Sequence, residues 1–416
     1  MFTPIIFKLP KSNIINEFIK ETDLIVQSKT MSQPLFSLGF HHFIIRTKNA
    51  MMITNKLETK NEFYYVVNSF EILISNYDNN INNLSKIYFN KNKINNFDKN
   101  FYIMWEISFI FDIIYDKKLT FIAMSENSEN FLQSIIYFRE KILNKDISKD
   151  NIYSVLINTQ KDEDTKYIIQ NYKLKTNIKN LKKEMNKTYS NLVILDNEKL
   201  WDNKSNQEQE SYKLILEEII YGLKILEENG SLILKIYDTF TIITIKLIWI
   251  LSSFFEETYI YKPFFSRPSD SDKYVVCKKL LFNQTDKKFI NALDNLEKIL
   301  NSINNDNYLN NIIPTLSVPL EWLNIFKFIN IKLVNIQQII INNIVKYIKD
   351  NNYFGDKYHD YKNNQIEATD WWVSIFFPPS SNLYQINKEI INKLVEDTII
   401  KNNFEIEKFN SQFIYD

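Results

Sequence analysis

Three apolar runs decide the fold class of this chain: NLVILD (191–196), GSLILKIY (230–237) and KYVVCKKL (273–280). Runs of this length and composition are typical of buried β-strands. The first run ends in an acid, Asp196, which the strand would present at its carboxyl end. Residues 207–227 repeat apolar side chains at helical spacing, and Asn229-Gly230 predicts the C-terminal end of that helix. The region therefore predicts alternating strands and helices in an α/β fold.

Lys235 is the unusual residue of these runs, because it interrupts the second apolar strand. A buried lysine is unfavourable unless it is paired, is neutral or lines a cavity. Two interpretations are open. The lysine could carry its ammonium group to solvent from the strand end, or it could belong to a functional site.

The order of motifs around these strands resembles a known family. An acid at a strand end, the sequence GSLILK, and then KP, SRP and YVVCK within residues 262–278 are similar to the C-terminal half of FtsJ-like RNA ribose 2'-O-methyltransferases. The similarity extends to the cap-type enzymes of large DNA viruses such as African swine fever virus. It implies a Rossmann-like methyltransferase core, S-adenosyl-L-methionine as cofactor, RNA as substrate and no metal.

The resemblance also implies a catalytic tetrad of Lys, Asp, Lys and Glu. Three of its positions fall on Asp196, Lys235 and Asp272, where the family usually has Glu at the last. A lysine with a depressed pKa can orient or deprotonate the weakly nucleophilic 2'-hydroxyl, and flanking carboxylates hold it in place. For Asp196 taken alone, a turn or helix-capping role is the alternative.

The first lysine of the tetrad is not found at the spacing that the family uses. Family members carry a lysine shortly after a tryptophan, and alignment on Trp105 puts Ile107 or Phe109 at that position. Lys48, in the sequence FIIRTKNAM, is the substitute that the sequence offers.

A strand at 119–124, a loop at 125–130 and a helix at 131–143 form the opening unit of a nucleotide-binding α/β domain. The loop lacks the Pro-Gly-Gly of the family, and the side chain of Glu129 would crowd the methionine end of the cofactor. By resemblance, the cofactor contacts are Glu126, Ser128, Asn130 and Asp196.

Recognition of RNA is predicted at Ser266 and Arg267, where a guanidinium group could pair with a phosphate. The alternative is a turn with a surface arginine. The densest basic segment lies within 161–187 and is interpreted either as a phosphate-tracking surface or as a solvated lysine-rich helix. Trp371-Trp372 could stack on a base or cap, although paired tryptophans beside Phe-Phe favour a core position.

Composition and charge exclude several kinds of site and of partner. The 416 residues carry 50 basic and 50 acidic side chains, so there is no global field to attract nucleic acid. One cysteine, Cys277, excludes an intrachain disulfide, and the three histidines lack metal-ligand spacing. Heavy use of Asn, Ile and Lys suggests an AT-rich genome. We expect no signal peptide and no membrane partner, and a cytoplasmic location, in the host cytoplasm or virion if the protein is viral.

We therefore expect a mostly helical N-terminal extension (1–99), an FtsJ-like core (100–280) and a helical C-terminal region (281–416). Two functions remain open. The first is a 2'-O-methyltransferase acting on RNA, with mRNA caps as the expected substrate and a capping or transcription complex as a possible partner. The second is an inactive homologue that binds RNA or protein. Further helices are predicted at 13–26, 63–75, 101–115, 240–255, 286–303, 324–349 and 385–401, and further strands at 150–158 and 258–261.

Overall fold

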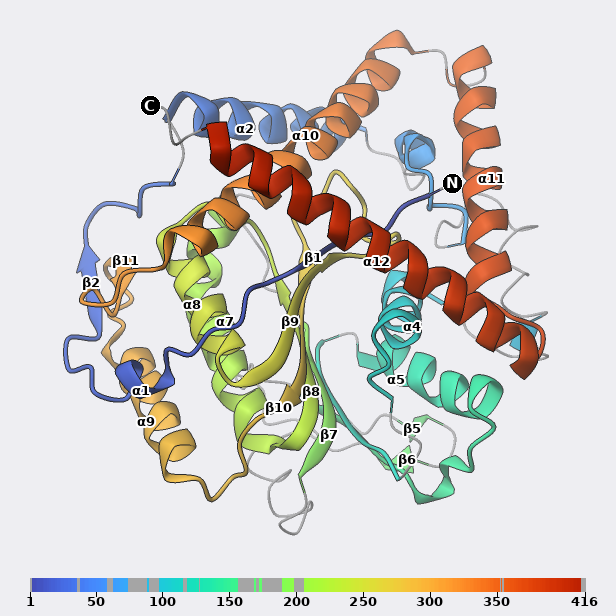
Figure 1. Ribbon diagram of the computed structural model, residues 1–416. Coiled ribbons are helices and arrows are strands. Elements are labelled where there is room, and N and C mark those ends of the chain that lie inside the picture. The colour runs from blue at the N-terminus through green and yellow to red at the C-terminus, as the bar shows by residue number, and fades with distance from the viewer. Residues whose placement is uncertain are drawn as a thin grey trace.

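A seven-stranded sheet lies at the centre of the molecule, in the order β1-β9-β10-β8-β7-β3-β4 (Figure 1). The computed structural model describes residues 2–35, 38–57, 63–73, 88–89, 97–114, 118–126, 128–155, 168–169, 172–173, 189–197, 206–351, 353 and 355–412. Strands β4, β3, β7 and β8 are parallel, β10 is antiparallel to both β8 and β9, and β1 is antiparallel to β9. The strands are β1 (Ile5–Lys8), β3 (Thr120–Met124), β4 (Asn151–Val155), β7 (Ser190–Leu195), β8 (Leu226–Ile236), β9 (Phe255–Lys262) and β10 (Lys273–Leu280).

Side chains of the central strands alternate between two apolar cores, one on each face of the sheet. In β7, Val193 and Leu195 enter one core, whereas Leu192 and Ile194 enter the other. This division follows from the two-residue period of a strand. Both faces are covered, which explains why the strand sequences are apolar throughout.

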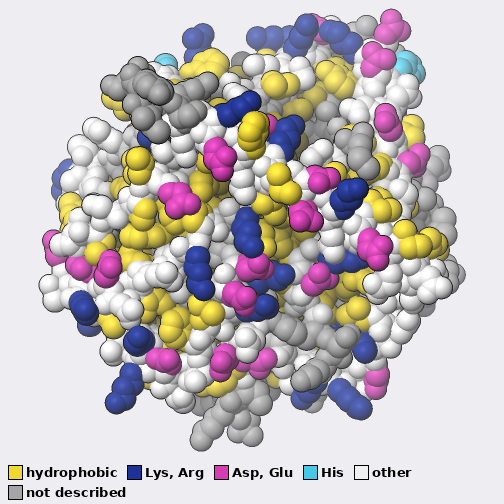
Figure 2. Space-filling model, in the orientation of Figure 1, with side chains coloured by type: hydrophobic (Ala, Val, Ile, Leu, Met, Phe, Trp, Pro, Cys, Tyr) yellow, Lys and Arg dark blue, Asp and Glu magenta, His cyan; other side chains and the backbone are white. Residues whose placement is uncertain are grey.

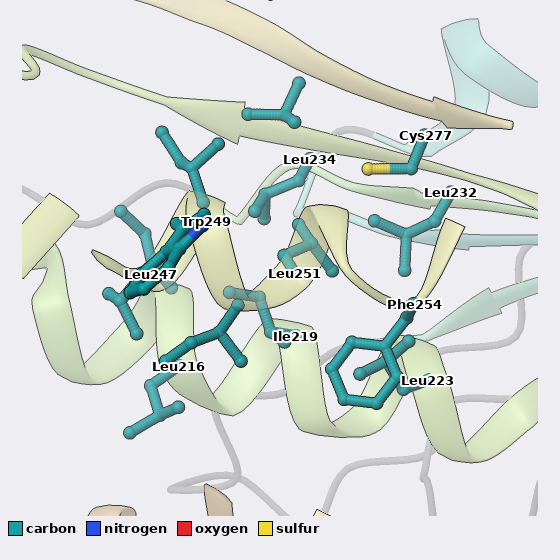
Figure 3. Packing of buried hydrophobic residues seen from close by; sticks show 14 of the residues in the cluster. Leu216, Ile219, Leu223, Leu232, Leu234, Leu247, Trp249, Leu251, Phe254 and Cys277 are labelled. Atoms are coloured by element: carbon teal, nitrogen blue, oxygen red, sulfur yellow. The ribbon is translucent and has the colours of Figure 1, made fainter. Parts of the chain in front are cut away.

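Helices from the whole chain cover the two faces. In Figure 3, side chains of α7, α8 and Phe254 point toward Leu232, Leu234 and Cys277 of the sheet. That face is covered by α7 (Gln207–Ile225), α8 (Ile242–Ser252), α9 (Lys287–Ser302) and part of α10 (Leu320–Asp350). The other face is covered by α4 (Lys99–Phe111), α5 (Ser128–Tyr137), α11 (Asp356–Phe376) and much of α12 (Ser381–Gln412). The predicted fold class, an α/β Rossmann-like core with helical additions, is confirmed.

The N-terminal region contributes strands as well as helices. β1 forms the edge of the main sheet, and α12 crosses over it (Figure 1), with the Asn402 amide donating to the Ile6 carbonyl at 2.7 Å. This contact satisfies a carbonyl of the edge strand, which would otherwise be open to pairing. The region also contains α1 (Ile15–Phe18), β2 (Ile25–Ser28), α2 (Leu38–Ala50) and two 3-10 segments, Met51–Lys56 and Phe63–Val67.

Two helices predicted in this region are wrong. The range 13–26 holds only the single turn α1, because residues 25–28 pair with β11 (Tyr308–Ile312) as a strand. The range 63–75 begins as a 3-10 segment that ends at Val67. In both cases the sequence spacing was ambiguous, and pairing or packing with distant residues decided the outcome.

The predicted end of the helix after β7 is also wrong. α7 stops at Ile225 and β8 begins at once at Leu226, so Asn229-Gly230 lies inside a strand and does not cap a helix. Asn229 has a φ of 63°, and a Cβ at Gly230 would meet the Glu227 carbonyl at 2.8 Å. The pair therefore forms a tight irregularity in the strand, which needs a residue without a side chain.

The C-terminal region packs on the core through long helices. α11 is a helix that the sequence pattern did not predict, and it buries Trp372 completely, which confirms the core interpretation for that residue. By length and mean hydropathy α10 could cross a membrane, and about a third of its apolar window is buried. In the structure α10 lies along α2, α8 and α12.

Glu106 of α4 joins the sheet, the loop after β9 and the C-terminal region. Its carboxyl group accepts hydrogen bonds from the Tyr261 hydroxyl (2.8 Å), the Phe264 backbone N–H (3.0 Å) and the Trp372 indole (2.9 Å). The residue is fully buried, and burial raises its pKa to about 8 despite these donors. One side chain thus holds three distant segments together.

We predict that Glu106→Gln changes the pH dependence of stability. Between the unfolded pKa near 4.5 and the folded value near 8, folding takes up a proton, so wild-type stability falls as pH rises. The free energy of unfolding of the wild type should fall by about 3 kcal/mol relative to Glu106→Gln between pH 5 and 8. Urea denaturation at several pH values measures this difference. The exposed Glu389→Gln is the control; equal pH profiles for all three proteins would contradict the prediction.

Candidate functional site

The candidate site lies where β7, β8 and β9 end and β10 begins. The register pairs Leu195 with Leu234 and Lys235 with Tyr274, so Asp196, Lys235 and Tyr274 form one row across three neighbouring strands. Side chains in one row point to the same face of a sheet. Here that face is the one covered by α4.

The side chains of the row are joined by polar contacts. The Lys235 ammonium donates to Oδ1 of Asp196 at 2.9 Å, and the Tyr274 hydroxyl donates to Oδ2 at 2.7 Å. Asp196 is 1 % exposed and Lys235 is 5 % exposed, so Lys235 does not carry its charge to solvent. A buried ion pair of this kind holds its members in place but contributes little net stability. Tyr274 is a member of the site that the sequence analysis missed.

Asp272 forms a second group beside this row. Its Oδ2 accepts from the Ser266 hydroxyl at 3.0 Å, and the Lys262 ammonium lies 3.6 Å from Oδ1. Burial disfavours the charged form of Asp272, but the charges of Lys262, Lys99 and Lys235 outweigh burial and hold its pKa well below the usual range. Asp272 is therefore a fixed negative charge near Lys235.

A further lysine, Lys99, lies close enough to Asp272 for its charge to act on that carboxylate, whereas alignment on Trp105 pointed to Ile107 or Phe109. Lys99 is the first residue of α4, and its charge helps to lower the pKa of Asp272. Burial raises the pKa of the neighbouring Asp98, and the charge of Lys99 offsets only part of this rise. The helix start lies at this edge of the sheet, because the Asp98 backbone N–H donates to the Asn130 side chain at 3.3 Å. Ile107 and Phe109 lie about 12–15 Å further along the helix and are buried in the core. An Asp–Lys pair at a helix start is the sequence signal for Lys99.

Two other predicted residues have partners outside the row. The Arg267 guanidinium binds Glu71 at 2.6 Å and lies over the Tyr65 ring, 3.5 Å from its centroid. Lys48 does not contact Lys235; it pairs with Asp238 and donates to the Ser271 hydroxyl at 2.8 Å. Both contacts join the N-terminal region to the edge of the sheet that carries the site.

The predicted cofactor residues lie at the same edge, beyond β3. The Ser128 hydroxyl is hydrogen-bonded to Ser154, Asn130 accepts from Asp98 as described above, and Glu126 is exposed. Glu129 is also exposed and accepts from Gln133 one turn along α5, at 3.1 Å. Its side chain is therefore exposed to solvent and held along α5.

Charge on the surface is mixed. On the face shown in Figure 2, basic and acidic side chains are interspersed. Most of the predicted basic segment within 161–187 lies outside the described residues, which include only the short strands Ile168–Ile169 and Tyr172–Lys173 there. Among the residues that the structure describes, no group of three His, Cys, Asp or Glu side chains could hold a metal ion.

Comparison with known proteins finds a family match in the part of the chain that carries Asp196, Lys235 and Asp272. Residues 140–280 match the model of the FtsJ-like methyltransferase family. The chain is similar to the cap-specific mRNA (nucleoside-2'-O-)-methyltransferase 1 of Xenopus laevis, with 37 % identity over 117 residues, which cover 28 % of this chain and 13 % of that protein. It is also similar to a probable methyltransferase of African swine fever virus, with 41 % identity over 93 residues, which cover 22 % of each chain. The alignments thus span less than a quarter of either relative.

The described residues fit the cofactor that methyltransferases of this kind use, S-adenosyl-L-methionine. The carboxyl ends of β3 and β7 are adjacent, since the Asp196 backbone N–H donates to the Met124 carbonyl at 2.8 Å. The half-buried Asp98 carboxylate, which accepts from the Asn100 backbone N–H at 2.8 Å, could hold a cationic group there, and α5 begins at the same edge with Ser128. In a sheet of this type ligands bind at this edge.

We predict that the buried pair of Lys235 and Asp196 is strongly coupled. Lys235→Met removes the cation that is paired with the buried Asp196, so it should lower the free energy of unfolding by about 3–5 kcal/mol. Adding Asp196→Asn should restore part of this loss. The surface pair of Lys8 and Glu257 is the matched control, and Lys8→Met should cost less than about 1 kcal/mol. A double-mutant cycle in urea measures the coupling, and strictly additive losses would rule it out.

Proposed function

Because the chain contains an FtsJ-like methyltransferase domain, we propose that it transfers a methyl group from S-adenosyl-L-methionine to a ribose 2'-oxygen of RNA, with capped mRNA as the substrate. The observation that carries the proposal is the convergence of Lys235, Asp196 and Asp272 at the ligand-binding edge of the sheet. Lys99 supplies the remaining lysine from α4. The names of the similar proteins support the choice of mRNA caps.

Each side chain of the site has a separate role in the proposed reaction. The cofactor supplies an electrophilic methyl group when it is bound. After losing its ammonium proton, the Lys235 amine would orient the 2'-hydroxyl and take its proton as the new O–C bond forms and the bond from the methyl carbon to sulfur breaks, leaving S-adenosyl-L-homocysteine. Asp196 holds Lys235 directly through one carboxylate oxygen, and Tyr274 holds Asp196 in place through the other. Asp272, held by Ser266 and Lys262, adds a negative charge near Lys235.

The composition and the similarity to the African swine fever virus protein support a viral origin and a place in the host cytoplasm or the virion. A capping or transcription complex would be the protein partner. The loop at 125–130 has no glycine, which supports the second function, an inactive homologue that binds RNA or protein. Cofactor binding separates the two functions.

We predict that the wild type binds S-adenosyl-L-methionine with micromolar affinity in calorimetric titration. Glu129→Gly should change the dissociation constant by less than about threefold, because the Glu129 side chain already points to solvent. Binding that appears only in Glu129→Gly would instead show that this side chain closes the cofactor site. That result would favour the inactive homologue.

We predict that Lys235→Arg lowers the rate of methyl transfer to capped RNA by about 100-fold or more. Arginine keeps the charge opposite Asp196 but cannot release its proton near neutral pH. Incorporation of labelled methyl groups, with the 2'-O position checked by resistance to alkaline hydrolysis, measures the rate. Cofactor binding should persist in the variant, and Lys8→Arg should match the wild type. Full activity in Lys235→Arg would exclude a proton-transfer role.

A further inference from the structure

A partly open cavity of about 190 Å³ adjoins the candidate site. Its wall includes Lys262 and Ser266, and both of these side chains also contact Asp272. One layer of side chains therefore separates the cavity from the carboxylate of the candidate tetrad. The cavity lies beside β8, β9 and β10, whereas the predicted cofactor residues lie beyond β3 and β7.

Much of this wall comes from parts of the chain outside the family match. The register of Ile5 with Lys262 places the residues before β1 past the edge of the sheet, next to the site. The 3-10 segment near Asn68 and the middle of α10 supply further parts of the wall.

The wall offers aromatic rings for stacking. Phe70 lies 5.2 Å from Phe2 and 5.0 Å from Phe264 between ring centroids, and all three rings are partly exposed. Ile336 and Ile340 of α10 add aliphatic surface. A cavity of about 150 Å³ already admits one benzene ring. The space and its lining therefore suit a single planar base.

One polar atom of the wall is an unused acceptor. Asn68 is 2 % exposed, and its amide nitrogen donates to Glu71 at 3.1 Å. Among the described residues its Oδ1 has no hydrogen-bond partner. A buried acceptor without a donor is unfavourable. Oδ1 is covered by neighbouring atoms, so an N–H group of a ligand would satisfy it once these move aside. The amino and imino groups of nucleobases are donors of this kind.

The basic side chains of the wall already have oxygen partners. Arg267 binds Glu71, Lys262 binds the carbonyls of Asp270 and Asp272, and Lys273 binds the carbonyl of Tyr237. A phosphate group entering the cavity would have to displace these partners. A neutral, aromatic ligand with a hydrogen-bond donor fits the wall better than a phosphate does.

We propose that this cavity binds the base of the nucleotide whose ribose is methylated. The inference rests on the proposed function, since it places that ribose at Lys235. The base stacks on the rings near Phe70 and donates to Asn68. A base that enters the cavity cannot be paired, so the acceptor nucleotide must be single-stranded. The N-terminal region and α10 thus select the substrate, although neither belongs to the matched part of the chain.

The test uses eight-nucleotide capped RNAs with 2-aminopurine at one of the first three positions. Stacking quenches the fluorescence of this base, so the signal reports the base and does not depend on methyl transfer. With the full-length wild type, we expect severalfold quenching at one position. Ile336→Trp fills the cavity and should abolish quenching and raise the RNA dissociation constant at least tenfold. Ile339→Trp is the matched control, because Ile339 lies on the outer side of the same helix and is 60 % exposed.

A second variant guards against misfolding of the first. Asn68→Leu removes the acceptor at similar volume and should raise the dissociation constant five- to tenfold. Bound RNA without quenching, together with equal affinity in all variants, would overturn the inference even if methyl transfer proceeds. Quenching that Ile336→Trp abolishes, without methyl transfer in the wild type, would support the base site and count against the proposed function. Failure to bind RNA would overturn both.

Discussion

The buried ion pair of Lys235 and Asp196 is the constraint on which this site depends. Two charges removed from water must satisfy each other, and the structure achieves this by placing them in one row of adjacent strands with Tyr274 as a third partner. The row exists because β7, β8 and β10 keep a fixed register. The arrangement of the site therefore depends directly on the register of these strands.

Segments that are distant in sequence from the central strands supply further residues around the site. α4 brings Lys99 to the site with its first residue and, two turns later, uses Glu106 to hold the loop after β9. Lys48 and Glu71, from the N-terminal region, bind Asp238 and Arg267 at the same edge. The additions to the core are thus part of the site's architecture, and β1 forms the edge of the sheet itself.

The sequence predicted the central elements well and their surroundings less well. Strands β7, β8 and β10 were predicted because each is an apolar run buried on both faces, a signal that survives any local ambiguity. The helix predicted at 13–26 is reduced to the single turn α1, and its last two residues, Ile25 and Val26, pair with β11, nearly 300 residues away. Lys99 was not predicted, because the spacing of residues from Trp105 does not show which end of α4 lies at the edge of the sheet that carries the site.

The sequence by itself determined the α/β class, a lysine within an apolar strand and a carboxylate at a strand end, since residue type and apolar pattern are local properties; the burial of Lys235 against Asp196 came from the tertiary structure. Tertiary structure alone decided that Tyr274 and Lys99 join them, that Arg267 is bound to Glu71, and that Glu129 faces solvent. These contacts depend on strand order, register and helix placement. Those features arise from pairing and packing between residues tens to hundreds of positions apart, which no local pattern encodes.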